Sequence, residues 1–325
     1  MQTLHQRNGR NARHADDALP IVDAHHHLWD LARGSYPWLN DDYHADFFLG
    51  DYRALCRDVS AGDYLDASAG QRVIATVHVE ADRARDEQLA ETAWLHEVNK
   101  QYGFPNAVVA HAWFDRDNTD AMLAAQAAWP LVRGIRSKPL TAKTPGDSVA
   151  GQPGSMQDQR WLDGYALLEK HGLSWDLRVP AWHLEEAAQV AAQFPGISIA
   201  LNHTGLPWDR SREGLRSWRH SMEVLARQPN AHVKLSEFGF KDTRWDLQSN
   251  QAVVRDTLAI FGAERCMFAS NFPVSGLHAD YDTTVDCVAG ALAGAGRAVQ
   301  EAVLCHNALR FYRIDAEASG AGAPA

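Results

Sequence analysis

Two histidines near the start of the chain have a spacing that suits them to chemistry. His25 and His27 lie two residues apart, shortly after the apolar pair Ile21-Val22. On an extended strand, residues i and i+2 point to the same side. The two imidazoles could therefore grip one metal ion or one substrate. An expression tag would be longer and terminal, so we interpret this run as functional.

Polar side chains also follow the other apolar runs that we expect to be strands. In a barrel of parallel strands, the carboxyl ends meet at one rim, which is where active sites form. Each residue alone has an ordinary explanation, such as a helix cap or a salt bridge. Together they predict a concave site built from His25, His27, Glu80, Arg136, Lys138, Arg178, His203, Glu237 and Asn271.

The elements that must position these residues alternate along the chain between short β-branched runs and longer helical patterns. Segments such as 184–193 and 253–261 carry apolar residues at the three- and four-residue intervals of an outer helix. Eight strands are expected, at 21–24, 72–79, 107–113, 132–135, 174–179, 197–202, 232–235 and 266–269.

Eight strands and this length predict a single (β/α)8 TIM barrel over residues 19–314. The rival fold, an open doubly wound sheet, would normally carry a Gly-rich phosphate loop after its first strand, where this chain has histidines. Residues 1–18 and 315–325 have the composition of short disordered tails. The segment 140–159, rich in Gly, Pro, Ser and Thr, is long for a loop and predicts either a lid or a connection without consequence.

The amino-acid composition and net charge limit the classes of molecule that this protein is expected to bind. The chain has 325 residues, 46% hydrophobic residues and a formal charge of -10, which provides for a sizeable core and argues against nucleic acid or an anionic membrane. No apolar run approaches the ~20 residues of a membrane span, and no signal-peptide core is present. We expect a cytoplasmic protein that acts on a small molecule, and homo-oligomer formation is left open.

Several motifs in one order carry a resemblance to a known family. They are the His-x-His strand, Asn202-His203-Thr204-Gly205, the stretch Val233-Lys234-Leu235-Ser236, and Ser270-Asn271-Phe272-Pro273. With them the chain resembles the amidohydrolase superfamily, and within it the amidohydrolase-related lactonases. The similarity covers nearly all residues between Leu19 and Ile314.

The resemblance implies that His25, His27 and His203 surround the reacting carbonyl. In much of the superfamily these histidines bind zinc or another divalent ion. Lactonases of this branch are not uniformly metal-dependent, so one divalent metal and a metal-independent site both stay open. The family commonly has an aspartate after strand eight as general base. This chain has Asn271 there, and an amide cannot accept a proton at neutral pH.

Two carboxylates are candidates for the missing acid-base group. Glu80 and Glu237 lie at the expected strand ends, and partial burial would raise the pKa of either one toward neutrality. Glu237 stands where similar sequences usually have glycine, and its alternative interpretation is a surface charge. If metal is bound, Glu80, Glu237 or Asn271 could be an additional ligand. His203 or His25 could also act as the base in a site without metal.

The remaining rim residues predict how a substrate is held. Arg136 can bind a carboxylate in bidentate fashion or stabilise an oxyanion. Lys138, Arg178 and Trp38 complete the expected substrate-binding set, which indicates an acidic or polyhydroxylated substrate.

We therefore expect a hydrolase that opens the lactone of a sugar acid or a muconolactone-like carboxylate, by attack of water or metal-bound hydroxide. One alternative on the same scaffold is a lactone isomerase or a decarboxylase. Another, motivated by Asn271, is a weakened barrel that binds a small acid without hydrolysing it. The fold alone does not decide among them.

Overall fold

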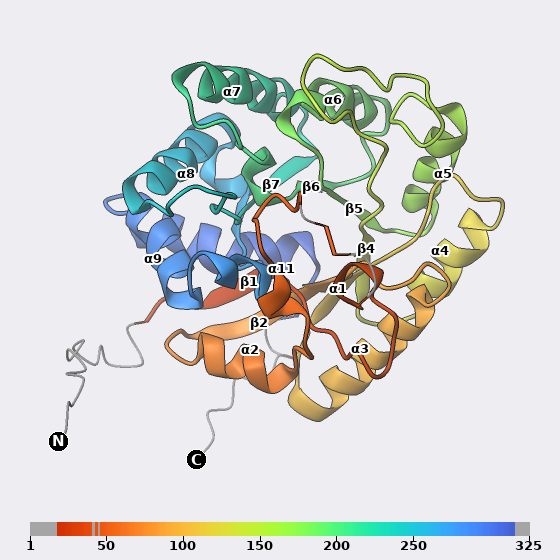
Figure 1. The fold of residues 1–325 in the computed structure, drawn as a ribbon, viewed down its shortest axis with the longest axis horizontal. Coiled ribbons are helices and arrows are strands. Elements are labelled where there is room, and N and C mark those ends of the chain that lie inside the picture. The colour runs from red at the N-terminus through yellow and green to blue at the C-terminus, as the bar shows by residue number, and fades with distance from the viewer. Residues whose placement is uncertain (1–17, 41–42, 45, 316–325) are drawn as a thin grey trace.

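The computed structural model describes residues 18–40, 43–44 and 46–315. The predicted tails lie outside the described residues, apart from Ala18 and Asp315. Eight parallel strands follow one another in chain order around a nearly closed (β/α)8 barrel, which confirms the predicted fold (Figure 1). The strands are β1 (Ile21–His26), β2 (Val73–Val79), β3 (Ala107–Ala110), β4 (Val132–Ile135), β5 (Ser174–Leu177), β6 (Ile199–Leu201), β7 (Ala231–Leu235) and β8 (Cys266–Phe268).

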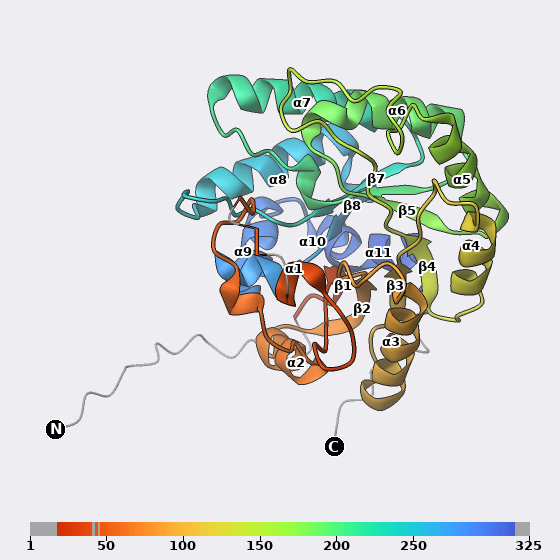
Figure 2. The ribbon, with the colours of Figure 1, turned by 45° about the vertical axis from the view of Figure 1, so that its right-hand side comes forward.

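Helices surround the strands, and α3 to α7 follow one another around the outside of the sheet (Figure 2). The helices are α1 (Pro37–Asn40), α2 (Ala61–Ser68), α3 (Gln88–Tyr102), α4 (Thr119–Ala127), α5 (Gln159–Lys170), α6 (Leu184–Gln193), α7 (Arg212–Ala226), α8 (Leu247–Phe261), α9 (Tyr281–Ala291), α10 (Arg297–Glu301) and α11 (Asn307–Phe311). Capping residues in the local sequence fix where several helices begin. Ser60 and Asp63 form a capping box at the start of α2, and Asp246 and Asp280 cap α8 and α9 with their side chains. In the part of the chain that is described, no helix is both long and apolar enough to cross a membrane.

The barrel interior is filled by small and β-branched side chains. Val22, Ala24, Val77 and Ala200 belong to one buried cluster with Tyr312, which follows α11. The strand residues that point to the other face of the sheet, such as Val233 and Leu235, belong to the larger core shared with the outer helices. The alternation of a pleated strand thus separates an inner core from an outer one.

A polar seam joins β1 to the end of β8. The amide of Asn271 donates to the carbonyl of His25 at 2.7 Å, and the amide of His27 donates to the carbonyl of Phe272 at 2.7 Å. The buried Asp23 carboxylate accepts from the amide and hydroxyl of Ser270, at 2.8 and 2.6 Å, and from the Tyr64 hydroxyl at 2.9 Å. These bonds hold the residues after β8 against the histidine strand.

Some strand ends differ from the prediction. The third strand was expected to reach Trp113, but β3 ends at Ala110. Ala110 pairs with Ile135, the last residue of β4, so no neighbouring strand remains to pair with His111 and Trp113. An apolar run continues past this point, and sequence alone does not show where pairing stops.

Candidate active site

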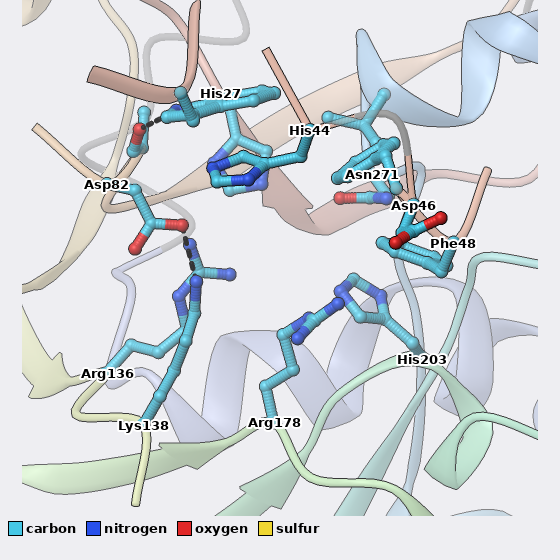
Figure 3. A pocket seen from close by; sticks show the side chains of 14 residues that line it. His27, His44, Asp46, Phe48, Asp82, Arg136, Lys138, Arg178, His203 and Asn271 are labelled. Atoms are coloured by element: carbon cyan, nitrogen blue, oxygen red, sulfur yellow. Dashed lines mark hydrogen bonds and ion pairs between the residues drawn. The ribbon is translucent and has the colours of Figure 1, made fainter. Parts of the chain in front are cut away.

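A cavity of about 480 Å³ opens at the carboxyl ends of the strands. This volume is in the range of small-molecule sites. Its walls carry both charged and aromatic side chains, which project from several strands and loops (Figure 3). The lining residues are His27, Trp38, His44, Asp46, Phe47, Phe48, Ala81, Asp82, Arg136, Lys138, Arg178, His203, Asn271 and Val274. Seven of the residues expected from the sequence are therefore on this wall: His27, Trp38, Arg136, Lys138, Arg178, His203 and Asn271.

The three predicted histidines lie together at one side of the cavity. His25 Nε2 is 3.1 Å from His27 Nε2, and the ring centroids of His25 and His203 are 4.7 Å apart. His27 and His203 line the cavity, whereas His25 does not. Burial is the largest cause that lowers the pKa of all three imidazoles well below 6.5, so they are neutral at pH 7.

The hydrogen bonds around His25 and His27 indicate where their protons lie. Lys234 Nζ is 3.5 Å from His25 Nδ1, so this nitrogen is the acceptor. His25 then carries its proton on Nε2 and donates to His27 Nε2. His27 Nδ1 in turn donates to the carbonyl of Val79 at 2.7 Å. Lys234 is itself buried in an ion pair with Asp176.

Glu237 and Asn271 are in direct contact. The Asn271 amide nitrogen donates to Glu237 Oε2, which also accepts from the Ser275 hydroxyl at 3.2 Å. The other oxygen, Glu237 Oε1, is buried and makes no hydrogen bond within the described structure. Burial is the main cause that raises the pKa of Glu237 from 4.5 to about 7. Because Asn271 uses its nitrogen on Glu237, its oxygen faces the cavity side (Figure 3).

Several of these residues hold a backbone conformation that is unfavourable for a side chain. His203, Glu237 and Asn271 have φ values of 59°, 53° and 52°, in the left-handed region. Asp82 has φ 54°. Strain of this kind gathers at functional sites, where the surrounding structure maintains it. It also explains why similar sequences usually have glycine at position 237, since glycine adopts this φ without cost.

The predicted Glu80 is behind the cavity wall and is engaged by Arg136. Arg136 Nε donates to the Glu80 carboxylate, and Arg136 Nη2 donates to the Glu80 carbonyl. The second carboxylate oxygen of Glu80 accepts from the amide of Asp82 at 2.8 Å. Arg136 therefore has only Nη1 without a protein partner in the described residues, so the bidentate grip on substrate expected for it is already used within the protein.

Lys138 and Arg178 differ in their partners. Lys138 forms an ion pair with Asp82, drawn as a dashed line in Figure 3. Arg178 has its Cζ 5.0 Å from the Phe48 ring centroid, and within the described residues no carboxylate lies at ion-pair distance from it. Its head points toward His203 (Figure 3).

The segment after α1 supplies wall residues that the sequence analysis missed. His44, Asp46, Phe47 and Phe48 line the cavity, and the segment crosses the barrel mouth (Figure 1). The carbonyl of Phe48 accepts from the amide of Lys241 at 2.9 Å, so the segment is tied to the loop after β7. A cluster of aromatic residues between the first two strands was the available signal.

The segment 140–159, one of whose predicted roles was a lid, contributes no residue to this cavity. The amide of Ala142 donates to His183 Nε2 at 2.8 Å, and the Trp182 indole donates to the Ala142 carbonyl at 3.2 Å. The loop therefore packs on the chain just before α6, and the segment over the mouth is the one after α1.

The spacing of the histidine nitrogens shows whether they could bind a metal ion. Two nitrogens bound to one tetrahedral zinc at 2.0–2.1 Å would be about 3.3 Å apart, and the pair His25–His27 is close to that distance. However, no group of three His, Cys, Asp or Glu side chains that could hold a metal is present in the described residues. His203 Nδ1 faces the Ser236 hydroxyl at 3.0 Å, which leaves its Nε2 free, and Lys234 Nζ is 3.5 Å from His25 Nδ1. In this conformation the described residues supply the His25–His27 pair without a third ligand, so they do not form a complete metal site.

Comparisons with known proteins agree with this architecture. The uncharacterized protein y4mH of Sinorhizobium fredii is 32% identical over 91% of this chain and 99% of its own length. An L-fucono-1,5-lactonase of Burkholderia ambifaria is 29% identical over 90% of this chain and 96% of its own length. A crystal structure of an amidohydrolase from Burkholderia multivorans with bound zinc has a TM-score of 0.73 at 24% identity, covering 91% of this chain and 99% of that one. Residues 22–314 match the amidohydrolase family model. The chain therefore belongs to the amidohydrolase family and is a hydrolase of that family, as its sequence motifs predicted.

Proposed function

We propose that this protein hydrolyses the ring ester of a lactone in the cavity at the barrel mouth. The observation that carries the proposal is that neutral imidazoles and a guanidinium reach the same cavity, which His27, His203 and Arg136 all line. A neutral imidazole can accept a proton from water, and a guanidinium can stabilise the oxyanion that forms when water attacks a carbonyl. The resemblance to a named lactonase supports this choice of ester.

In the proposed reaction, the lactone carbonyl oxygen lies at Arg136 Nη1. Glu80 fixes the direction of that group because it occupies Nε and Nη2. The Asn271 oxygen accepts a hydrogen bond from the attacking water and orients it, and Glu237 holds the amide so that this oxygen faces the water. Glu237 and Glu80 are thus positioning residues, a role different from the base expected for them.

His203 accepts the proton of the attacking water and returns it to the leaving ring oxygen. Its Nδ1 donates to the Ser236 hydroxyl in this arrangement, which leaves Nε2 as the base. Burial lowers the pKa of His203, so its imidazole is neutral at pH 7 and free to accept a proton.

The test is acid release from a panel of aldonolactones and carboxylated lactones, followed with a pH indicator. We expect the His203→Ala variant to lose about 10²–10⁴-fold in kcat, the usual contribution of a positioned general base. The matched control is His220→Ala, because His220 is exposed on α7. Acid release that His203→Ala does not reduce would contradict the role of His203. Consumption of a lactone without acid release would point instead to an isomerase or a decarboxylase, and no turnover to a binding protein.

A further inference from the structure

Three cationic side chains reach the cavity, and two of them are already neutralised by the protein. Arg136 forms a buried ion pair with Glu80, and Lys138 forms an ion pair with Asp82. Arg178 is the third, and the described residues offer it no such partner. The charge available for a ligand is therefore concentrated on one guanidinium.

The surroundings of Arg178 make its unpaired positive charge energetically unfavourable unless an anion binds. The side chain is half-buried, and burial together with the nearby Arg136 lowers the pKa of its guanidinium. The ring of Phe48 contacts one face at 5.0 Å from Cζ, which leaves the N–H edge of the planar group for hydrogen bonds. Uncompensated charge in a partly buried place is normally paired.

The carboxylate of Asp46 also lines the cavity, so it is the obvious candidate for an internal partner. Asp46 and Arg178 form no ion pair, and Asp46 projects from the segment after α1 beside Phe48 (Figure 3). Asp46 therefore does not occupy the donor edge of Arg178.

A carboxylate matches this edge better than a sugar hydroxyl does. Guanidinium binds carboxylate through two parallel charge-assisted hydrogen bonds, whereas hydroxyl groups do not compensate its charge. The guanidinium points toward His203 (Figure 3), so an anion held there would be next to the carbonyl that His203 serves.

We propose that Arg178 anchors a carboxylate substituent of the substrate, so that the enzyme prefers lactones carrying a carboxylate near the ring ester over neutral sugar lactones. This inference rests on the proposed hydrolysis and names its substrate class. It also assigns the carboxylate-binding role expected for Arg136 to Arg178, on the neighbouring strand end, because Glu80 already engages Nε and Nη2 of Arg136.

The experiment compares a five-membered lactone carrying a carboxylate with the same lactone carrying a carboxamide. We expect wild-type kcat/KM to be at least about 30-fold higher for the carboxylate, in line with the loss of one bidentate charged pair. Arg178→Met should remove that preference by lowering kcat/KM for the carboxylate alone, and Arg178→Lys should restore part of it. The control Arg227→Met changes an exposed arginine just after α7 and should keep the preference.

Two results would overturn the anchor. One is equal kcat/KM for both lactones in the wild type, and the other is an equal loss for both in Arg178→Met. If neither lactone is hydrolysed, the proposed function fails, and the anchor is then decided by calorimetric binding of tetrahydrofuran-2-carboxylate, which has the ring and carboxylate without the ester. Weaker binding to Arg178→Met by about 30-fold would support it, whereas no binding or equal binding would refute it. Thermal unfolding of each variant confirms that it is folded.

Discussion

The two walls of the cavity differ in whether their cationic side chains have carboxylate partners. On the wall formed by the ends of β2 and β4, Arg136 and Lys138 each have a carboxylate, from Glu80 and Asp82. On the wall formed by the ends of β5 to β8, the Arg178 guanidinium has no carboxylate partner in the described residues, and its contact is the Phe48 ring. The cations of the first wall are thus paired within the protein, and the second wall keeps one cation without a carboxylate.

This difference shows that a charged residue at a strand end is not by itself a binding residue. Glu80 and Arg136 satisfy each other and give the wall its shape. What marks a group as available is that the fold buries it without giving it a partner, because such a group is costly until a ligand binds. Four measurements test whether the two walls differ in this way.

The largest effect is expected where a partner is removed from the β2–β4 wall. Arg136→Met leaves Glu80, whose side chain is 1% exposed, as a buried charge without its cation. Breaking one side of such a pair costs about 3–5 kcal/mol, measurable as the free energy of unfolding in urea. The double variant Arg136→Met/Glu80→Gln should recover a large part of that loss. A cost under about 1 kcal/mol for Arg136→Met would show that this wall is not held by the pair.

The second effect comes from the pKa of Glu237, which is raised to about 7. The folded protein keeps a proton between pH 4.5 and about 7 that the unfolded chain releases, so its stability falls as the pH rises through this window. The loss is up to about 3 kcal/mol. Glu237→Gln keeps the shape and lacks the titration, so its urea stability should depend less on pH between 5 and 8. Glu213→Gln, at an exposed position of α7, should follow the wild type; parallel curves for Glu237→Gln and the wild type would refute the raised pKa.

A smaller effect is expected when Arg178 is removed from the β5–β8 wall. Arg178→Met takes away a half-buried charge that has no carboxylate partner in the described residues, so the free energy of unfolding should stay the same or rise by about 1 kcal/mol. The substitution is the same as in Arg136→Met, which makes the two directly comparable in urea. A loss as large as that of Arg136→Met would mean that Arg178 is paired in solution and that the two walls do not differ.

The smallest effect is expected on removal of metal. Because the described residues bring no third ligand to His25 and His27, dialysis against EDTA should change kcat/KM by less than about twofold, which is ~0.4 kcal/mol. Metal content measured before and after dialysis is the control. A tenfold loss that zinc restores would show that a third ligand turns toward His25 and His27 when metal is present.

Much of the site could be predicted because strand ends converge wherever parallel strands form a barrel. His27, Arg136, Arg178, His203 and Asn271 were all found in this way, and all line the cavity. His44 and Phe48 were missed because they reach the mouth from a connecting segment, whose path depends on long-range contacts such as the bond between Phe48 and Lys241. The end of β3 was misplaced for a similar reason, since it depends on where β4 stops pairing.

The barrel could be predicted from the alternation of eight apolar runs with amphipathic helices, and its rim from the polar residues after those runs. Which of these polar groups form pairs within the protein follows from the three-dimensional arrangement of the strands. Glu80 and Arg136 are 56 residues apart, and Asn271 and Glu237 are 34 apart. Pairing at such separations depends on the relative placement of whole strands, which local spacing does not encode. The polar strand ends therefore indicated where the cavity lies, and three-dimensional pairing left Arg178 as the cavity cation without a carboxylate partner in the described residues.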